Sequence, residues 1–143
     1  IIKKSSKQYY IFRLTNLVGS GGNKNTLLNY FVGKIRKKEK FDVWKNATRN
    51  IIDATDCLNI VNDTISDLPH SRVLNIANPI NYSVLSIVEN IENHLQIKGD
   101  YSVSNNGIPF QIDTTEIDHI IDKYIPEIKR GLRYLNDILS KYY

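Results

Sequence analysis

Tyr9-Tyr-Ile-Phe-Arg-Leu-Thr-Asn-Leu-Val-Gly19 is the stretch that decides the fold of this 143-residue chain. Residues 9–14 are aromatic or aliphatic apart from Arg13, a pattern that predicts a buried β-strand. The strand runs into Thr15 and Asn16 and then into a glycine-rich loop, residues 19–23. Ligands of α/β sheets gather just past the carboxyl ends of the strands. Asn16 therefore lies where a side chain would meet a ligand.

Composition narrows the class of protein. Hydrophobic residues make up 41% of the chain and charged residues 24%, which is typical of a globular protein with one core. A formal net charge of +4 is too mild to require a nucleic-acid partner. No apolar run approaches the roughly 20 residues of a membrane helix. The single cysteine, Cys57, excludes an internal disulfide, and the first residues lack the apolar segment of a signal peptide, so we expect a cytoplasmic protein.

After the glycine loop, apolar residues recur at helical spacing from Leu27 to Ile35, and Asn25 or Thr26 is placed to cap that helix. The loop itself, Gly19-x-Gly-Gly, is not a dinucleotide fingerprint, because the third glycine and the downstream acid are missing. Tyr30 and Lys34 have the spacing of a catalytic Tyr-x-x-x-Lys pair. We expect Tyr30 to pack beside Phe31 instead.

The middle of the chain contains two further strands. Phe41–Trp44 alternates and predicts a short strand, in which we expect Trp44 to pack in the core rather than stack on a base. A second strand follows Arg49, and Thr55 or Asp56 then caps a helix. That helix runs through Leu58, Val61 and Ile65 and ends before Pro69. No metal site is expected, since His70 has no partner at ligand spacing.

The second half repeats the strand–helix pattern. Ser71–Ala77 predicts a strand, and Ser83 caps a helix that Gly99 ends. A short strand over Tyr101–Val103 follows, and Asp113 or Thr114 then opens another helix. Pro126 begins the last helix. The apolar residues expected to face inward on these helices are Val84, Val88, Ile91, Leu95, Ile117, Ile121, Ile128, Leu132, Leu135 and Leu139.

Two segments carry a resemblance to a known family. Arg13-Leu-Thr-Asn-Leu-Val-Gly19 resembles the Arg-x-x-Asn-Val-x-Gly segment of the extended short-chain dehydrogenase/reductases, the NAD-dependent sugar epimerase/dehydratase family. Arg49 and Asp56 match the spacing of the family's Arg, strand and Asp that opens a helix, although Asp53 and Ala54 replace its usual residues. The later strands and helices follow the family's order. The resemblance covers about residues 9–143 and implies the C-terminal, substrate-binding half of such an enzyme.

The resemblance implies roles for four residues. Asn16 would contact the sugar or the diphosphate of a nucleotide-sugar, and Thr26 and Leu27 would lie along the nucleotide. Arg49 would clamp the phosphates, because its planar fork suits bidentate contact. The alternative for Arg49 is a salt bridge with Asp53 or Asp42.

The resemblance also implies a fold and a partner. The fold would be α/β, the last parallel strands of a Rossmann-type domain with a small α+β substrate-binding lobe. Residues 1–143 would form a single fragment without the N-terminal half that binds NAD or NADP. Its catalytic Tyr-x-x-x-Lys would lie in that half, so we expect the fragment alone to be inactive. The absence of methionine fits a fragment or ordinary processing. The missing half, or a second copy in a possible homodimer, would cover the apolar strands.

Three alternatives remain. The chain could be a free-standing binding or interaction module, in which case strands 9–14 and 73–77 should pair with each other or with another copy. It could bind nucleic acid through Lys34–Lys40, with a steep dependence on salt. It could also be a non-catalytic relative that senses NAD(P) or sugars.

Overall fold

The computed structural model describes residues 7–70 and 72–143. Along these residues the chain forms eight strands, five α-helices and two short 3-10 helices. The first half contains β1 (Tyr10–Leu14), β2 (Asn16–Val18), α1 (Leu27–Lys37), β3 (Phe41–Trp44), β4 (Thr48–Arg49), β5 (Ile51–Asp53) and α2 (Ala54–Asp67). The second half contains β6 (Arg72–Ile76), β7 (Tyr82–Ser83), α3 (Val84–Leu95), β8 (Tyr101–Ser104), η2 (Thr115–Ile117), α4 (Asp118–Tyr124), η3 (Glu127–Lys129) and α5 (Leu132–Tyr142). Ser71, predicted to begin β6, lies outside the described residues.

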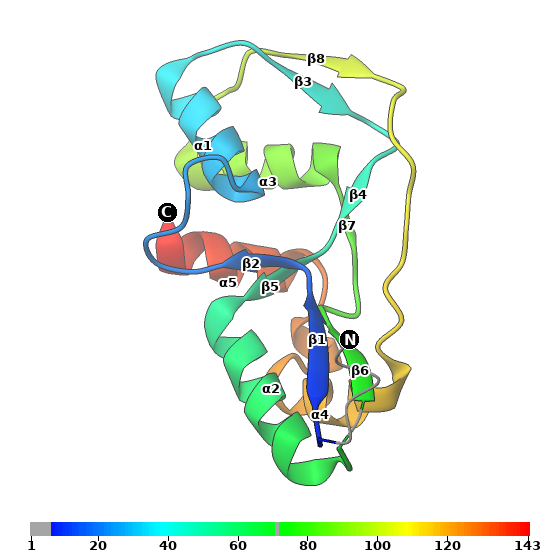
Figure 1. Ribbon diagram of the computed structural model, residues 1–143. Helices are drawn as coiled ribbons and strands as arrows, with labels where there is room; N and C mark the ends of the chain where they lie inside the picture. The colour runs from blue at the N-terminus through cyan, green and yellow to red at the C-terminus, as the bar shows by residue number, and fades with distance from the viewer. Residues whose placement is uncertain (1–6, 71) are drawn as a thin grey trace.

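Figure 1 shows these elements in two groups with a layer between them. β1, β6, α2 and α4 gather at the lower end, whereas β3, β8, α1 and α3 form the upper end. β2, β5 and α5 lie between the two groups, where α5 packs against α3. The predicted α/β class, with parallel strands and a small α+β lobe, is confirmed.

The strands form four pairs, three of them parallel. β1 pairs with β6, β2 with β5, and β3 with β8, while β4 and β7 are antiparallel. β2 follows β1 after a single residue, and β5 runs directly into α2. The carboxyl ends of β2 and β5 therefore lie side by side, next to the start of α1 and α2.

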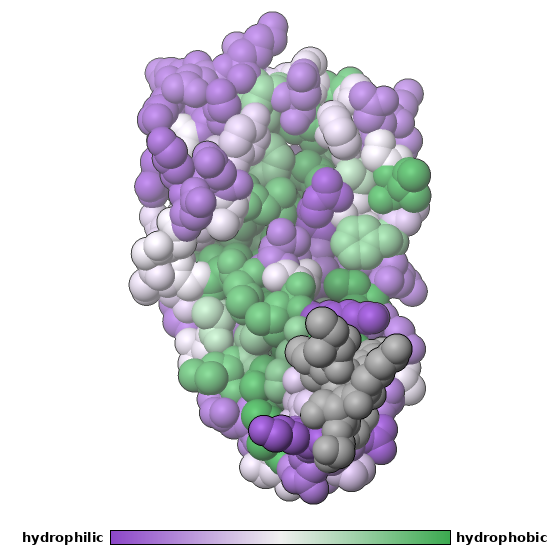
Figure 2. All heavy atoms as spheres, viewed as in Figure 1, coloured by the Kyte–Doolittle hydropathy of each residue, from purple (hydrophilic) through white to green (hydrophobic). Residues whose placement is uncertain are grey.

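β1 is less buried than its sequence predicts. Its residues are half-buried at best, and Leu14 is 49% exposed. The reason is that β6 occupies one edge of β1, and no strand in the described part of the chain pairs with the other. Leu17, on β2, is also exposed, and Figure 2 shows hydrophobic surface gathered around β2 in the middle of this view. β1 and β2 thus present an open strand edge beside an apolar surface.

The predicted helix starts are partly right. Ser83 caps α3 as expected, with its Oγ accepting from the N–H of Ser86 at 3.0 Å. Thr26 occupies the cap position of α1 but gives no capping hydrogen bond. The prediction that Thr55 or Asp56 caps α2 is wrong. Asp53 is the cap, because its Oδ1 accepts from the N–H groups of Thr55 at 2.7 Å and Asp56 at 3.4 Å.

Several apolar residues of the helical segments are exposed. In α2 the buried residues are Cys57, Ile60 and Thr64, whereas Leu58 and Ile65 are exposed. Pro126 begins only the short η3, and α5 starts after Gly131, where the backbone φ is 75°. The expected inward positions of Ile128 and Leu132 are therefore wrong, with exposed fractions of 77% and 49%.

The end of α3 also differs from the prediction. The helix stops at Gln96 rather than Gly99, and Gln96 adopts the left-handed conformation with φ 56°. Gly99 lies in the loop that follows, where its N–H donates to Oε1 of Glu92 at 2.7 Å. A side chain at Gly99 would come within 3.2 Å of Ile35, Phe41 and Tyr101, so close packing explains this glycine.

Candidate functional site

A hollow of about 370 Å³ lies between β2 and the start of α1. We call it the Asn16 cavity. Its lining residues are Thr15, Asn16, Leu17, Val18, Asn25, Thr26, Leu27, Leu28 and Ile51. It therefore brings Asn16, which lies two residues beyond the carboxyl end of β1, together with Thr26 and Leu27 at the start of α1. Ligands of α/β sheets gather just past the carboxyl ends of strands, which is where Asn16 lies relative to β1.

Asn16 is held in place by the neighbouring strand. Its Nδ2 donates to the carbonyl of Asn50 at 2.7 Å, and the Thr15 hydroxyl donates to the same oxygen at 2.9 Å. The Asn16 side chain is exposed, and its Oδ1 has no hydrogen-bond partner within residues 7–70 and 72–143. This oxygen is available to accept a hydrogen bond from a ligand hydroxyl.

A second hollow of about 200 Å³ lies on the other side of the first turn of α1. We call it the Arg49 cavity, and it is lined by Leu27, Phe31, Asp42, Trp44, Ala47, Arg49 and Val84. Leu27 lines both hollows, so the two adjoin. All four residues that the sequence proposed for substrate contact thus line this pair of cavities.

Arg49 is half-buried and makes no ion pair with any carboxylate of the described residues. Its Nη1 donates to the carbonyl of Thr48 at 2.7 Å, which fixes the guanidinium and leaves other donors unused. The alternative of a salt bridge with Asp53 or Asp42 is wrong. Asp53 is taken by Lys141, whose Nζ lies 3.0 Å from Oδ2, and Asp42 accepts from the Ser102 hydroxyl. Arg49 is therefore a cation that one hydrogen bond holds in place and that has no carboxylate partner among the described residues.

Trp44 is 48% exposed, so the prediction that it packs in the core is wrong. β3 alternates strictly, with Phe41 and Val43 buried and Asp42 and Trp44 exposed. The last two share one face of the strand, since side chains two apart in a strand point the same way. The alternation was visible in the sequence and was the signal that could have placed both residues in a site.

The first turn of α1 adds positive character between the two cavities. No side chain caps this turn, because the Thr26 hydroxyl donates to the carbonyl of Asn23 at 2.9 Å instead of accepting from the helix. The N–H groups at the start of a helix carry partial positive charge and favour anions. Together with Arg49, they form a surface suited to a negatively charged group.

Tyr30 and Lys34 each have a structural partner. Lys34 Nζ lies 2.9 Å from Oε2 of Glu39, and this hydrogen bond raises the pKa of Lys34. Tyr30 packs edge-on against Phe31 with ring centroids 5.2 Å apart, as predicted. Within the described residues, no group of three or more histidine, cysteine or acidic side chains could hold a metal ion.

A buried polar cluster behind β5 was not predicted. Tyr134 of α5 accepts from the N–H of Asp53 at 3.0 Å and donates to Oδ2 of Asp56 at 2.6 Å. Burial raises the pKa of both Tyr134 and Asp56. Burial also acts to raise the pKa of Asp53, but the interactions with Lys141, Tyr142 and the Thr55 N–H together outweigh it, so the pKa of Asp53 is lowered. No sequence signal pairs residues about 80 positions apart. The cluster anchors α5 to the strand that follows Arg49.

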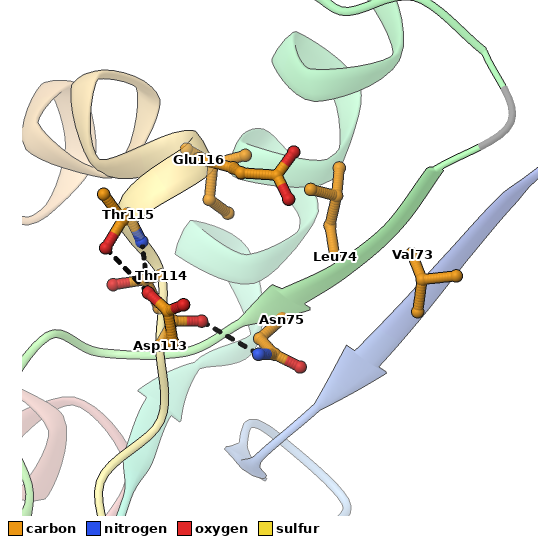
Figure 3. Close-up of a pocket in the computed structure, with 8 residues that line it drawn as sticks. Val73, Leu74, Asn75, Asp113, Thr114, Thr115 and Glu116 are labelled. Atoms are coloured by element: carbon orange, nitrogen blue, oxygen red, sulfur yellow. Dashed lines mark hydrogen bonds between the residues drawn. The ribbon is translucent and has the colours of Figure 1, made fainter.

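A smaller hollow of about 60 Å³ lies beside β6 (Figure 3). Asn75 of β6 points toward the 113–116 segment and donates to the carbonyl of Asp113 at 2.8 Å. The Asp113 carboxylate accepts from the N–H of Thr115 at 3.0 Å, as expected for a residue that opens a helical turn. These polar groups are satisfied by one another, and their hydrogen bonds stabilise the chain that follows β8. The hollow is small, and we do not assign it as a ligand site.

The structure resembles solved structures of nucleotide-sugar enzymes. It matches dTDP-glucose 4,6-dehydratase from Bacillus anthracis in complex with NAD at TM-score 0.67 and 17% identity, covering 92% of this chain and 44% of that one. It matches UDP-glucose 4-epimerase from Thermotoga maritima with UDP-glucose at TM-score 0.70 and 14% identity, covering 97% and 48%. RMD from Pseudomonas aeruginosa, complexed with NADPH, gives TM-score 0.67 and 15% identity over 92% and 48%.

No protein-family model and no curated protein matches the sequence. The chain spans just under half the length of the structures above. At these identities the comparison shows the fold alone, and the chain folds like part of these nucleotide-sugar enzymes. The predicted resemblance to NAD-dependent sugar epimerases and dehydratases is confirmed at that level. None of the helices in the described residues is long and apolar enough to span a membrane.

Proposed function

We propose that this chain is the substrate-binding portion of an NAD(P)-dependent nucleotide-sugar epimerase, dehydratase or reductase. The observation that carries the proposal is the convergence of Asn16, Thr26, Leu27 and Arg49 on two adjoining cavities, with Asn16 just past the carboxyl end of β1. The fold comparison adds that the structures above, which bind NAD, NADPH or UDP-glucose, share this arrangement of elements.

The two cavities suit different parts of a nucleotide-sugar. Trp44 gives the Arg49 cavity an exposed aromatic face on which a base could stack. The uncapped start of α1 lies where the two cavities adjoin, and Arg49 lines the second cavity, so both would offer positive charge to a diphosphate. The Asn16 cavity is the larger and has the free Oδ1 acceptor, which suits the hydroxyls of the sugar. The role of the chain is then to bind and orient the sugar for chemistry that the cofactor supplies.

The described residues do not themselves form a dinucleotide site. The glycine loop between β2 and α1 is closed by its own hydrogen bonds, in which Asn23 accepts from the N–H of Asn25 and from Nδ2 of Asn29, both at 2.9 Å. A loop that cradles a pyrophosphate needs its N–H donors open to the ligand, and the N–H of Asn25 is already bonded within the loop. We therefore propose that NAD(P) is held by a separate portion of the enzyme, and that residues 1–143 alone do not catalyse turnover.

That portion would also complete the sheet. β1 leaves one edge unpaired among the described residues, and exposed Leu14 and Leu17 lie beside it. A parallel strand from a Rossmann-type NAD-binding portion would satisfy the edge and cover the apolar surface. A second copy of this chain is the other candidate for that place.

The proposal is tested by nucleotide binding. Trp44 is the single tryptophan of the chain, so its fluorescence reports directly on the Arg49 cavity. Nucleoside diphosphates should quench this fluorescence, and the matching nucleosides should bind more weakly. Arg49→Gln should reduce diphosphate affinity by roughly 10- to 100-fold and leave nucleoside affinity nearly unchanged, because charge-assisted hydrogen bonds contribute about 1.5–3 kcal/mol each. Arg133→Gln is the control, since Arg133 is an exposed arginine on α5 away from both cavities.

Two results would overturn the proposal. The first is no binding of any nucleoside diphosphate, and the second is equal loss of affinity in the Arg49 and Arg133 variants. Turnover of nucleotide-sugars by the 143 residues with added NAD(P) would refute the narrower claim that the chain alone is inactive.

A free-standing binding module is the second candidate function. The pairing of β1 with β6 over five residues agrees with this hypothesis, which requires it. The enzyme hypothesis requires the same pair, so the pairing alone does not separate the two. The mass of the native protein from its source does. A mass near 16.5 kDa favours the module, and a mass near twice that value favours an enzyme with a cofactor portion.

A further inference from the structure

We infer that the Asp42 carboxylate selects a guanine base, so that the nucleotide of the substrate is a guanosine diphosphate. This inference rests on the proposed function and specifies its substrate class. It starts from the Arg49 cavity, where Asp42 is the single carboxylate among seven lining residues. Arg49 is the single cation there, and the remaining five side chains are apolar.

Asp42 is positioned rather than neutralised. It makes no ion pair with any lysine, arginine or histidine of the described residues, although Arg49 lines the same cavity. Its Oδ1 accepts from the hydroxyl of Ser102, which lies directly opposite it in the β3–β8 pair. A hydroxyl donor from the adjacent strand fixes the carboxylate without cancelling its charge. Its Oδ2 has no partner within residues 7–70 and 72–143.

The arrangement of charges matches a nucleotide. Asp42 and Trp44 project from the same face of β3, so a base stacked on the indole would present its edge toward the carboxylate. The phosphates would then extend toward Arg49 and the start of α1. One cavity thus offers both an acceptor for N–H groups and positive charge for an anion.

The chemistry of a carboxylate distinguishes the bases. The edge of guanine that pairs with cytosine carries two adjacent N–H donors, which match the two oxygens of a carboxylate in a bidentate contact. Uracil and thymine present a single N–H between two carbonyl oxygens, and those oxygens repel a carboxylate. Adenine and cytosine present an amino group next to a ring-nitrogen acceptor. A site built to accept two N–H groups rejects bases that lack them, because the carboxylate is then desolvated without partners.

The test measures the binding of GDP, UDP, dTDP, ADP and CDP to the 143-residue chain. Trp44 fluorescence and calorimetry are the two readouts. We expect GDP to bind about 5- to 150-fold more tightly than UDP, the range expected for one bidentate base contact. Asp42→Asn should weaken GDP by a similar factor and reduce the GDP-to-UDP ratio toward one. Because Asp42 is exposed, this variant should fold, which circular dichroism checks. Asp100→Asn is the control, since Asp100 is an exposed aspartate that does not line the cavity.

The outcomes separate this inference from the proposed function. If no nucleoside diphosphate binds, both fail. If all five bind with similar affinity and Arg49→Gln weakens all of them, the proposed function stands and the guanine inference is overturned. An unchanged GDP-to-UDP ratio in Asp42→Asn also overturns it. A GDP preference that Asp42→Asn abolishes and Asp100→Asn preserves supports it.

Discussion

Tyr134→Phe should destabilise the protein although it removes a single oxygen. The Tyr134 hydroxyl is one of the links between α5 and the β5–α2 connection, and it makes two hydrogen bonds in a buried setting. Its bond to the Asp56 carboxylate, at 2.6 Å, involves a charged group and contributes about 1.5–3 kcal/mol. Its loss also leaves the buried N–H of Asp53 without a partner, at a cost of about 1–3 kcal/mol.

The adjacent hollow moderates the expected effect. Tyr134, Asp53 and Asp56 line a hollow of about 170 Å³, from which water can replace part of the lost bonding. We therefore expect the free energy of unfolding to fall by about 2–4 kcal/mol, a large share of the 5–15 kcal/mol typical of a domain. Urea unfolding followed by far-ultraviolet circular dichroism measures this difference.

The matched control is Tyr30→Phe, which removes an exposed hydroxyl and should change stability by less than about 0.5 kcal/mol. In an Asp56→Ala background, Tyr134→Phe should cost about half as much, because one of its two partners is already gone. If Tyr134→Phe costs no more than Tyr30→Phe, the hydroxyl does not hold α5 in place and the reasoning fails.

Two further changes test other parts of the fold. Lys141→Met removes the partner of buried Asp53, whose pKa lies below its ordinary value of 3.8. The change should destabilise the protein at pH 7 by about 1–2 kcal/mol, a modest cost because Lys141 itself is half exposed. A lowered carboxyl pKa stabilises the fold at neutral pH and loses that effect as the pH falls through the pKa of the folded state, so the difference from the parent protein should shrink as the pH falls below 3.8 in acid-unfolding curves. Gly107→Ala should cost about 2 kcal/mol or more in thermal or urea unfolding, because Gly107 has φ 98° and a new Cβ would lie 2.6 Å from Ala47. An unchanged midpoint would show that the chain after β8 shifts freely away from the Arg49 cavity.

Local patterns sufficed to predict the elements whose burial and capping are encoded within a few residues. Ser83 and the stripe of Val84, Val88 and Ile91 placed α3 correctly, because the cap and the apolar face lie in one short window. The alternation of Phe41 and Val43 likewise placed β3. The order of strands and helices was enough to identify the fold.

The errors arise where a distant residue decides between local candidates. The run Asp53-Ala-Thr-Asp56 offered several caps for α2, and the choice of Asp53 follows from Tyr134 and Lys141, which no local pattern connects to it. The C-terminal end of α3 and the start of α5 were misplaced for a similar reason. Gln96 adopts a left-handed conformation that sequence assigns to glycine, and Gly131 rather than Pro126 sets the start of α5.

The candidate site was predicted in its members but not in its geometry. Asn16, Thr26, Leu27 and Arg49 could be proposed from spacing and resemblance, and the structure places all four on two adjoining cavities. Trp44 was assigned to the core because large aromatic residues are usually buried. Its exposure depends on which face of β3 meets α3, and that choice is made by β8 and the helices, not by β3 alone.

The unpaired edge of β1 has a consequence for biosynthesis. Among the described residues β1 is paired with β6 along one edge and has no strand along the other, and an open strand edge can pair with any other extended chain, including a nascent copy of the same protein. If the complementary strand precedes β1 on the same polypeptide, it has already folded when β1 leaves the ribosome, and the edge is covered as it forms. If that strand arrives from a separate polypeptide, the interval before assembly is set by concentration, and the relative timing of translation of the two genes becomes a determinant of yield.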